Sequence, residues 1–585
     1  MKPKPKPKPK PKPKPKPKPK SESEPEPKSE LEPKSEPDAG STRAAETVTV
    51  LEAVIRFCRD TGMTTVFGNP GSTELRMFRD WPDDFTYVLG LQESVAVGMA
   101  AGHALGTGRA ALVSLHSAGG VGHALGAVFN AYRDRVPLVV LAGQQSRALT
   151  QLRPFLGADD PVQFPRPYVK SSRQPDRAAD VPAVLAEAHR LAMSHPRGPV
   201  FVSVPEDDWD RPAAYVEPRT LHGGFSADAG ALSALATRLD TCERPALVVG
   251  PGVDDEHATA EVRALAERTR AAVWISPMSG RSGFPESHPL FQGFLPPAAD
   301  RLAACLEAYD VVVALGAPLF TYHFHTESPP LPARTELFHL DCDPGQAAWL
   351  PTGTSIVTTL KPAVGQLAAL VRESDRKPPP SRPVPLPTHA PGDGDGDGPI
   401  TPELVLDLLQ ERLPRDRVLV EETPSHREAL HARVRIESEG GFLTTGSGAL
   451  GWGLPLAVGR ALADRRRVVC LVGDGSALYS VQALWTAARH RVPVTYVLLD
   501  NGGYAAVRAL GRRIDIAPVP GTDIGDIDFA RVATGFGCPA AYVEESADLP
   551  AALDRALAGH GDDDGPFLLH VRVDDGAFDS DSRDR

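Results

Sequence analysis

Two oxygen-bearing side chains, Asp474 and Asn501, each lie within two residues of the end of an apolar run, 468–472 and 494–499. Residues 476–490 carry apolar side chains at helical spacing, which predicts a strand–helix–strand unit with parallel strands. The carboxyl ends of such strands meet at one edge of the sheet, where ligands bind. A carboxylate and an amide oxygen at that edge, beside a helix N-terminus, suit a hard cation that bridges to phosphate.

Three further polar side chains, Ser72, Glu93 and His116, follow predicted strands near the start of the chain. Parallel strands would place all three on one rim of a second sheet. Each also has a structural interpretation, with Ser72 as a helix N-cap, Glu93 as a first-turn acid and His116 as a capped loop residue. Their joint occurrence with a metal–phosphate edge favours a catalytic site. The predicted strands are Thr64–Phe67, Thr86–Leu89 and Ala111–Leu115.

Strand and helix patterns alternate in three segments, which predicts an α/β protein with three doubly wound parallel-sheet domains. The predicted domains span residues 46–210, 227–373 and 400–575. Residues 1–44 form a low-complexity tail that begins with alternating Lys and Pro, for which we expect disorder or an extended polyproline-II rod. Residues 377–398 form a Pro-, Gly- and Asp-rich linker.

The composition narrows the functional classes. The 585-residue chain is 41% hydrophobic, and its six scattered cysteines include no Cys-x-x-Cys pair, which argues against a disulfide framework or zinc site. No apolar run is long enough to span a membrane, and the N-terminus lacks a signal-peptide pattern, so we expect a cytoplasmic protein that is not bound to membranes. The net charge is −12 although residues 1–20 contain ten Lys, so the remainder is acidic and nucleic-acid binding is not expected.

Two other patterns have simpler interpretations. Residues 393–398 alternate Asp and Gly like the start of a calcium loop, but the bidentate acid that such a loop needs would fall at Leu404. Gly446, Gly448 and Gly451 match the dinucleotide-binding glycine pattern, but no acid clearly placed at the end of a following strand supports it. We interpret the first pattern as linker and the second as a loop of another kind.

The chain resembles the thiamine-diphosphate-dependent 2-oxo acid decarboxylases over residues 47–575, and within that family it is most similar to the benzoylformate decarboxylases. The resemblance implies pyrimidine-binding, central and diphosphate-binding domains, in chain order. It also implies a small-molecule 2-oxo acid substrate. The motifs that carry the resemblance are Val66–Ser72, Leu91–Glu93, Leu115–Ala118, Ala142–Gln145, Gly473–Ser476, Ala483–Ala488 and Val519–Gly521.

The resemblance also implies how the cofactor is held. Asp474, Asn501 and the backbone carbonyl of Gly503 would coordinate Mg²⁺, and Gly475 and Ser476 would adjoin the diphosphate. Glu93 would hydrogen-bond the aminopyrimidine ring, the carbonyl of Gly448 would accept from its amino group, and Leu450 would support the bent cofactor. Asp500 and Gly503 depart from the family, which usually has Asn at the first position and, in the benzoylformate decarboxylases, Thr at the second.

Catalytic roles follow from the same resemblance. Ser72 would bind the substrate carboxylate, and His116 and His288 would transfer protons. Ala506, Val507 and Leu510 would line the substrate pocket. Leu510 stands where the family has a bulky Phe, so a substituted aryl or a branched group could fit, with an aromatic 2-oxo acid as first choice.

The resemblance implies an assembly in which the cofactor lies between the first domain of one subunit and the third domain of another. We therefore expect at least a homodimer and favour a homotetramer. The central domain resembles one that binds FAD in acetolactate synthase, but Gly250-Pro251-Gly252 alone does not support a flavin. Two alternatives stay open: a carboligase that forms 2-hydroxyketones, and a non-catalytic scaffold with a tethering tail.

Overall fold

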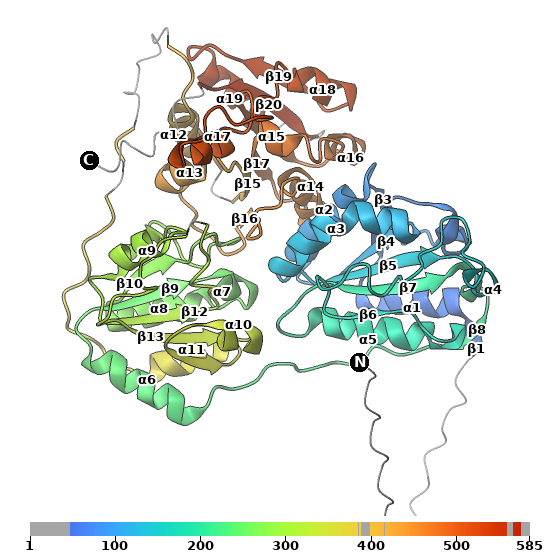
Figure 1. The fold of residues 1–585 in the computed structure, drawn as a ribbon, viewed down its shortest axis with the longest axis horizontal. Coiled ribbons are helices and arrows are strands. Elements are labelled where there is room, and N and C mark those ends of the chain that lie inside the picture. The colour runs from blue at the N-terminus through green and yellow to red at the C-terminus, as the bar shows by residue number, and fades with distance from the viewer. Residues whose placement is uncertain are drawn as a thin grey trace, which may run out of the picture. The chain divides into compact units, whose positions relative to one another are not determined.

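The computed structural model describes residues 47–323, 325–383, 385–387, 398–414, 416–558 and 565–574 (Figure 1). The predicted tail 1–44 lies outside the described residues, as do residues 388–397 of the predicted linker with most of the candidate calcium loop. Three six-stranded sheets are present, and every pairing within them is parallel. This confirms the predicted α/β class with three parallel-sheet domains.

The first sheet has the order β3-β2-β4-β5-β7-β6, with helices on both faces (Figure 1). Its strands are near-continuous buried apolar runs, which is typical of parallel strands covered on both sides. The strands in sheet order are β3 (Thr86–Leu89), β2 (Thr65–Gly68), β4 (Ala111–Leu115), β5 (Leu138–Gln144), β7 (Val200–Pro205) and β6 (Ser172–Arg173). The helices are α1 (Val50–Thr61), α2 (Glu93–Thr107), α3 (Ser117–Arg133), α4 (Arg147–Thr150), α5 (Val181–Met193) and the 3₁₀ helix η1 (Ser72–Phe78); β1 (Thr47–Thr49) pairs antiparallel with β8 (Pro212–Ala214).

The central sheet has the order β11-β10-β9-β12-β13-β14, the strand order of dinucleotide-binding folds. The segments after β9 and β12 meet at the point where this order reverses, and the Gly252 N–H donates to the Gly316 carbonyl at 3.0 Å. Backbone therefore joins the two loops between which such folds hold a ligand. The elements are β11 (Phe291–Phe294), β10 (Ala272–Ile275), β9 (Pro245–Val249), β12 (Val311–Leu315), β13 (Glu336–Asp341), β14 (Thr354–Val357), α6 (Ala229–Thr241), α7 (Pro251–Asp255), α8 (Thr259–Thr269), α9 (Ala299–Leu306), α10 (Pro344–Trp349) and α11 (Leu360–Leu370).

The third sheet has the order β16-β15-β17-β18-β20-β19. Counted in chain order, its strands are arranged as in the first sheet, so the two domains share one topology. The strands are β16 (Phe442–Thr444), β15 (Val418–Glu422), β17 (Val468–Gly473), β18 (Val494–Asp500), β20 (Phe567–Arg572) and β19 (Ala540–Val543). The helices are α12 (Pro402–Arg412), α13 (Arg427–Arg433), α14 (Gly453–Asp464), α15 (Asp474–Ala477), α16 (Ala483–Arg489), α17 (Ala505–Arg513), α18 (Phe529–Gly535) and α19 (Leu549–Leu557).

The single helix predicted over residues 476–490 is wrong between Leu478 and Gln482. There the chain turns through i→i+3 hydrogen bonds, such as Tyr479 N–H to the Ser476 carbonyl at 3.2 Å, and separates α15 from α16. Apolar spacing cannot distinguish these tighter turns from an α-helix, because both keep side chains three apart on one face.

Helices α2 and α14 join the first and third domains within the chain. A Cβ atom built on Gly102 would lie 2.1 Å from the Leu456 carbonyl oxygen, and one on Gly459 would lie 1.8 Å from the Met99 carbonyl oxygen. The two helix backbones therefore touch directly, which only glycine allows at these points. Within the described ranges, no helix is long and apolar enough to cross a membrane.

Candidate active site

The candidate residues lie where the strand order of two sheets reverses. In the first domain the order reverses between β2 and β4, whose following loops carry Ser72 and His116. In the third domain it reverses between β15 and β17, and Asp474 follows β17 directly. Such reversal points open crevices at the carboxyl ends of the strands. The topology thus supplies two edges, each with polar side chains at its crevice.

His116 is held by a buried acid that the sequence did not reveal. Its Nδ1 lies 3.1 Å from Oε2 of Glu74, a residue of η1 whose side chain is only 3% exposed, and 3.1 Å from Oγ1 of Thr73. The same Glu74 oxygen accepts the Gly71 N–H at 2.9 Å. Because a carboxylate only accepts hydrogen bonds, this contact places the proton of His116 on Nδ1 and leaves Nε2 for other chemistry.

Glu93 begins α2 and is 8% exposed. Its Oε2 faces Nδ1 of His123 at 3.1 Å, and its Oε1 accepts from Nδ2 of Asn69 at 3.4 Å. Asn69 belongs to the loop after β2, the same loop that carries Ser72. Ser72 itself is exposed at the start of η1.

The sheet edge of the third domain that carries Asp474, Asn501 and Gly503 is called the metal-type edge below. Backbone N–H groups hold its buried acid. Asp474 is 4% exposed; its Oδ1 accepts the Gly475 N–H and its Oδ2 accepts the Gly503 N–H, both at 2.7 Å. Asn501 is also buried, and the carbonyl of Gly503 accepts the Ala505 N–H at 3.0 Å. Gly503 has φ +147° and lies against the Thr522 carbonyl oxygen, so a side chain there would clash. Asp474 therefore contacts Gly503, which the resemblance implied as a ligand, and Asn501 follows β18, the strand paired with β17.

The pKa values of the two acids at this edge, Asp474 and Asp500, are shifted in opposite directions. Burial, reinforced by the nearby charge of Asp500, raises the pKa of Asp474 to about 6. Burial also opposes ionisation of Asp500, but hydrogen bonds from His570 and the Gly502 N–H together with the charge of Arg572 lower its pKa to about 2. The Oδ1 of Asn501 is buried and has no hydrogen-bond partner among the described residues. An acid with a raised pKa beside an unsatisfied amide oxygen is the environment that a cation would stabilise.

The glycine-rich loop before α14 is held from two sides. In the first domain, Asn130 Nδ2 donates to the Ala449 carbonyl at 3.0 Å, and Asp134 Oδ1 accepts the Gly446 N–H at 3.0 Å. In the third domain, Glu422 accepts the N–H groups of residues 451–453 at 2.7–3.2 Å. Gly448 has φ +78° with open space around it, and Leu450 is half-buried. Glu422 could not be recognised as a loop anchor from the sequence, because its contacts to the loop arise only when the chain folds.

His288 lies within a hydrogen-bond network of the central domain. Its Nε2 is 3.2 Å from Glu267 Oε1, its Nδ1 accepts the Leu290 N–H at 3.2 Å, and its ring packs edge-on against Phe284. Both ring nitrogens are therefore occupied within the chain. The structure shows no contact between His288 and the His116 loop among the described residues.

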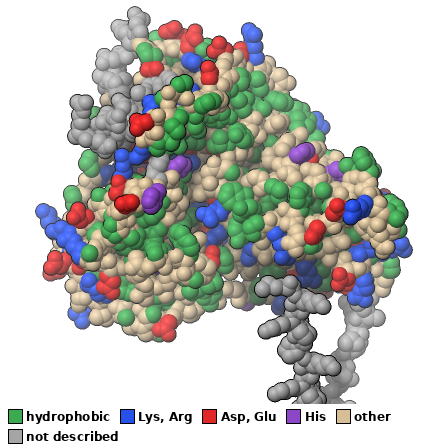
Figure 2. Space-filling model, viewed as in Figure 1, with side chains coloured by type: hydrophobic (Ala, Val, Ile, Leu, Met, Phe, Trp, Pro, Cys, Tyr) green, Lys and Arg blue, Asp and Glu red, His purple; other side chains and the backbone are tan. Residues whose placement is uncertain are grey.

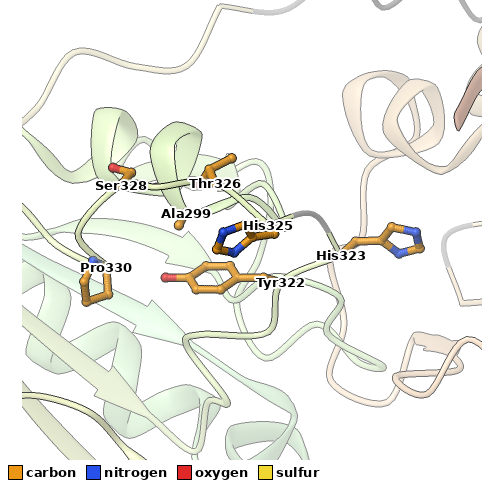
Figure 3. Close-up of a pocket in the computed structure, with 7 residues that line it drawn as sticks. All are labelled: Ala299, Tyr322, His323, His325, Thr326, Ser328 and Pro330. Carbon is orange, nitrogen blue, oxygen red and sulfur yellow. The ribbon is translucent and has the colours of Figure 1, made fainter. Parts of the chain in front are cut away.

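Two histidines of the central domain, His323 and His325, were not among the predicted site residues. His323 and His325 line a cavity of about 400 Å³ in the central domain together with Tyr322, Thr326 and three other residues, Ala299, Ser328 and Pro330. Figure 3 shows the His323 ring directed away from the rest of this lining. These histidines follow β12 by several residues, so the signal that could have found them is a His-x-His pair after a buried strand.

The predicted pocket residues Ala506, Val507 and Leu510 lie together on α17. The Ala506 N–H donates to Oγ of Ser425 at 3.1 Å, and the Val507 side chain is 44% exposed. Helix α17 begins just after Gly503, so this wall adjoins the metal-type edge.

Comparison with known proteins identifies the family. Models of the N-terminal, central and C-terminal domains of thiamine pyrophosphate enzymes match residues 48–164, 232–367 and 425–571. Benzoylformate decarboxylase of Pseudomonas aeruginosa is 40% identical over 528 residues, 89% of this chain and 98% of that protein. The chain belongs to the thiamine pyrophosphate enzymes.

Solved structures of this family agree with the fold. A thiamine diphosphate-dependent 4-hydroxybenzoylformate decarboxylase of Rhodococcus jostii superposes with a TM-score of 0.85 at 38% identity, covering 90% of this chain and 99% of that one. Benzoylformate decarboxylase of Polynucleobacter necessarius gives a TM-score of 0.86 at 33% identity over the same shares. An acetolactate synthase large subunit of Escherichia coli is more distant, at 27% identity over 89% of this chain and 95% of that protein.

The thiamine pyrophosphate enzyme chain fits its cofactor at the third-domain edge. The Oδ1 of Asn501 lacks a donor among the described residues, and a cation would stabilise the ionised form of Asp474, whose pKa is raised by burial. The open space at Gly448 leaves room for a ring against the loop backbone. Hard oxygen donors of this kind match Mg²⁺, the usual companion of thiamine diphosphate.

Proposed function

We propose that this chain decarboxylates an aromatic 2-oxo acid of the benzoylformate type to an aldehyde and CO₂. The observation that carries the proposal is the Glu74–His116 pair beside Ser72 and Glu93, within a chain 40% identical to a benzoylformate decarboxylase. Bound thiamine diphosphate supplies the electron sink for the electron pair of the carbon–carbon bond that breaks when CO₂ leaves. The protein's part is to bind, orient and transfer protons.

The cofactor-binding roles are assigned by position. Asp474, Asn501 and the Gly503 carbonyl would hold Mg²⁺, and Gly475 and Ser476, both buried after β17, would adjoin the diphosphate. Glu93 would hold a proton at the pyrimidine ring from its buried site at the start of α2. Gly448 and Leu450 would lie against the same ring from the loop that Asn130 and Glu422 fix.

The substrate roles follow from exposure and hydrogen bonding. Ser72 is exposed at the carboxyl end of β2, where its hydroxyl could donate to a substrate carboxylate. The Nε2 of His116 would give a proton to the substrate oxygen, because Glu74 keeps the other ring nitrogen protonated and stabilises the imidazolium. A positioned acid of this kind contributes about 10²–10⁴-fold in rate.

A second proton-transferring histidine would come from the central domain. His288 was the sequence-based choice, but its two nitrogens are already occupied. We propose His323 as the better candidate, since it borders a cavity and its ring is directed away from the other lining residues (Figure 3). His323→Ala should lower kcat by at least tenfold, whereas His288→Ala should change mainly the melting temperature; the reverse pattern would restore His288.

The working unit is proposed to be at least a homodimer. Hydrophobic side chains gather over α3 of the first domain (Figure 2), and Tyr132, Phe164 and Tyr168 are each about 40% exposed. Large exposed apolar patches of this kind mark association surfaces. Sedimentation of the full chain should give a dimer or tetramer that Tyr168→Asp weakens, and a monomeric wild type with full activity would contradict this. Six free cysteines, five of them buried, suit the cytoplasm.

The test is a panel of 2-oxo acids with product identification. Purified protein with thiamine diphosphate and Mg²⁺ should release CO₂ and aldehyde fastest from benzoylformate or its para-substituted forms, and far more slowly from pyruvate. Glu93→Gln should lose most turnover while retaining some cofactor. Formation of 2-hydroxyketone as the main product, in the presence of added aldehyde, would instead make the chain a carboligase. No CO₂ from any acid would leave the scaffold interpretation.

A further inference from the structure

Asp500 is the last residue of β18 and lies beside the metal-type edge. It is buried directly before Asn501, and its Oδ1 accepts the Gly502 N–H at 2.9 Å. Its Oδ2 meets His570 Nε2 at 2.9 Å and Arg572 at 3.1 Å. Three donors therefore hold this carboxylate, through both of its oxygens.

Strand pairing explains why these groups meet. In the parallel ladder of β18 with β20, Asp500 is opposite Arg572 and Leu498 is opposite His570. Residues two apart on a strand share a face, so His570 and Arg572 both reach the Asp500 carboxylate. Phe529 packs edge-on against the His570 ring at 5.4 Å between centroids, which fixes the ring's orientation.

We propose that Asp500 is a positioning residue that strengthens divalent-cation binding at the Asp474–Asn501 edge, with His570 and Arg572 holding its carboxylate in place. The inference rests on the proposed function of that edge as the Mg²⁺ and diphosphate site. The chemical class of the ligand is a hard divalent cation bridged to a diphosphate.

Two physical effects act in the same direction. First, Asp500 fixes the Gly502 N–H and so the turn at φ +73° and +147° that presents the Gly503 carbonyl and the Asn501 side chain. Second, Asp474 and Asp500 directly follow the paired residues Gly473 and Leu499 of neighbouring strands, so two carboxylates lie at adjacent strand ends and a divalent cation relieves the repulsion between them. A neutral amide at position 500 would lack the charge, and its single oxygen could not accept from the Gly502 N–H as well as from His570 and Arg572.

Asp500→Asn tests the inference on the full chain. Partners outside the ligand shell alter metal affinity by about 10–100-fold, so we expect the Mg²⁺ dissociation constant, measured by titration calorimetry with thiamine diphosphate present, to rise by about that factor. Arg572→Lys, which keeps the positive charge but alters the geometry of the contact and leaves His570 in place, should weaken Mg²⁺ binding by a smaller factor of about three to ten.

Asp523→Asn is the matched control. Asp523 bridges to Gly503 through its backbone and is exposed, so its substitution removes the same charge nearby without touching His570 or Arg572. We expect less than a twofold change. Unchanged Mg²⁺ affinity in Asp500→Asn, or equal weakening by Asp523→Asn, overturns the inference. If Asp500→Asn does not fold, unchanged affinity in Arg572→Lys overturns it alone. Failure of the wild type to bind Mg²⁺ with the cofactor would refute the proposed function instead.

Discussion

Replacing Glu74 by Gln should slow turnover while leaving the fold and the cofactor in place. The amide keeps the shape of the side chain and can still accept the Gly71 N–H and the His116 Nδ1–H through one oxygen. What it removes is the negative charge 3.1 Å from the imidazole nitrogen. Glu74→Gln therefore isolates the electrostatic part of the interaction from its geometry.

The size of the effect follows from the distance. Two unit charges about 4 Å apart attract by about 4 kcal/mol at an effective dielectric constant of 20. The His116 side chain is 19% exposed, so solvent screening reduces this to about 2 kcal/mol, which is about a 30-fold loss of rate. The loss should appear in kcat, because the Glu74 charge stabilises the imidazolium that gives its proton to the bound substrate and has no direct part in substrate binding.

The assay is steady-state decarboxylation of benzoylformate at saturating thiamine diphosphate and Mg²⁺, with cofactor affinity measured separately. Thr73→Val is the control, because Thr73 also lies 3.1 Å from His116 Nδ1 but is neutral, and we expect less than a fivefold loss. The reasoning is refuted if Glu74→Gln turns over within threefold of wild type. It is equally refuted if Thr73→Val is as slow as Glu74→Gln, since geometry and not charge would then be responsible.

Three other substitutions test the fold and the pocket. Burial raises the pKa of Glu256 to about 7, so the folded chain holds a proton that the unfolded chain releases near the ordinary pKa of Glu. The free energy of unfolding therefore falls as pH rises between those two values. Glu256→Gln should reduce this fall by at most about 3 kcal/mol, measured by denaturant titrations at pH 5 and 8. Gly102→Ala should destabilise by about 1–3 kcal/mol or more through its clash with the Leu456 carbonyl, whereas Gly126→Ala, which meets nothing within 4 Å on α3, should be neutral or stabilising. Leu510→Phe should lower kcat/KM for para-substituted benzoylformates more than for benzoylformate itself, and equal losses would place Leu510 outside the pocket.

The sheets could be predicted because parallel strands buried on both faces are continuous apolar runs, and because Asp474 and His116 follow such runs directly. Glu74 could not be predicted in the same way. It lies 42 residues before His116 in a 3₁₀ turn, and only the neighbouring positions of β2 and β4 bring the two together. The turns between α15 and α16 were missed because apolar spacing alone does not separate i+3 from i+4 bonding.

The second histidine shows a different limit of sequence reading. A motif match selected His288 from a Pro-rich loop, but a side chain's availability depends on what its two nitrogens already touch, and both are occupied by the central domain. His323 follows the buried strand β12, as His116 follows β4, although at a greater distance along the chain. The proposal of His323 rests on its position after a strand, and the prediction of His288 rests on the local sequence; comparing His323→Ala with His288→Ala decides between the two signals.

The first and third domains share one strand order, yet their crevices hold different chemistry. At the carboxyl ends of the strands of the first domain the side chains are Glu74, His116 and Glu93, which suit proton transfer next to organic rings. In the third domain they are Asp474 and Asn501, which suit a cation. The backbone geometry is common to both, so the difference is set by a few residues in the loops that follow the strands. Asp500 is the last residue of β18, and the pairing of β18 with β20 brings His570 and Arg572 to its carboxylate. Strand pairing, and not the loops alone, therefore orients this charge.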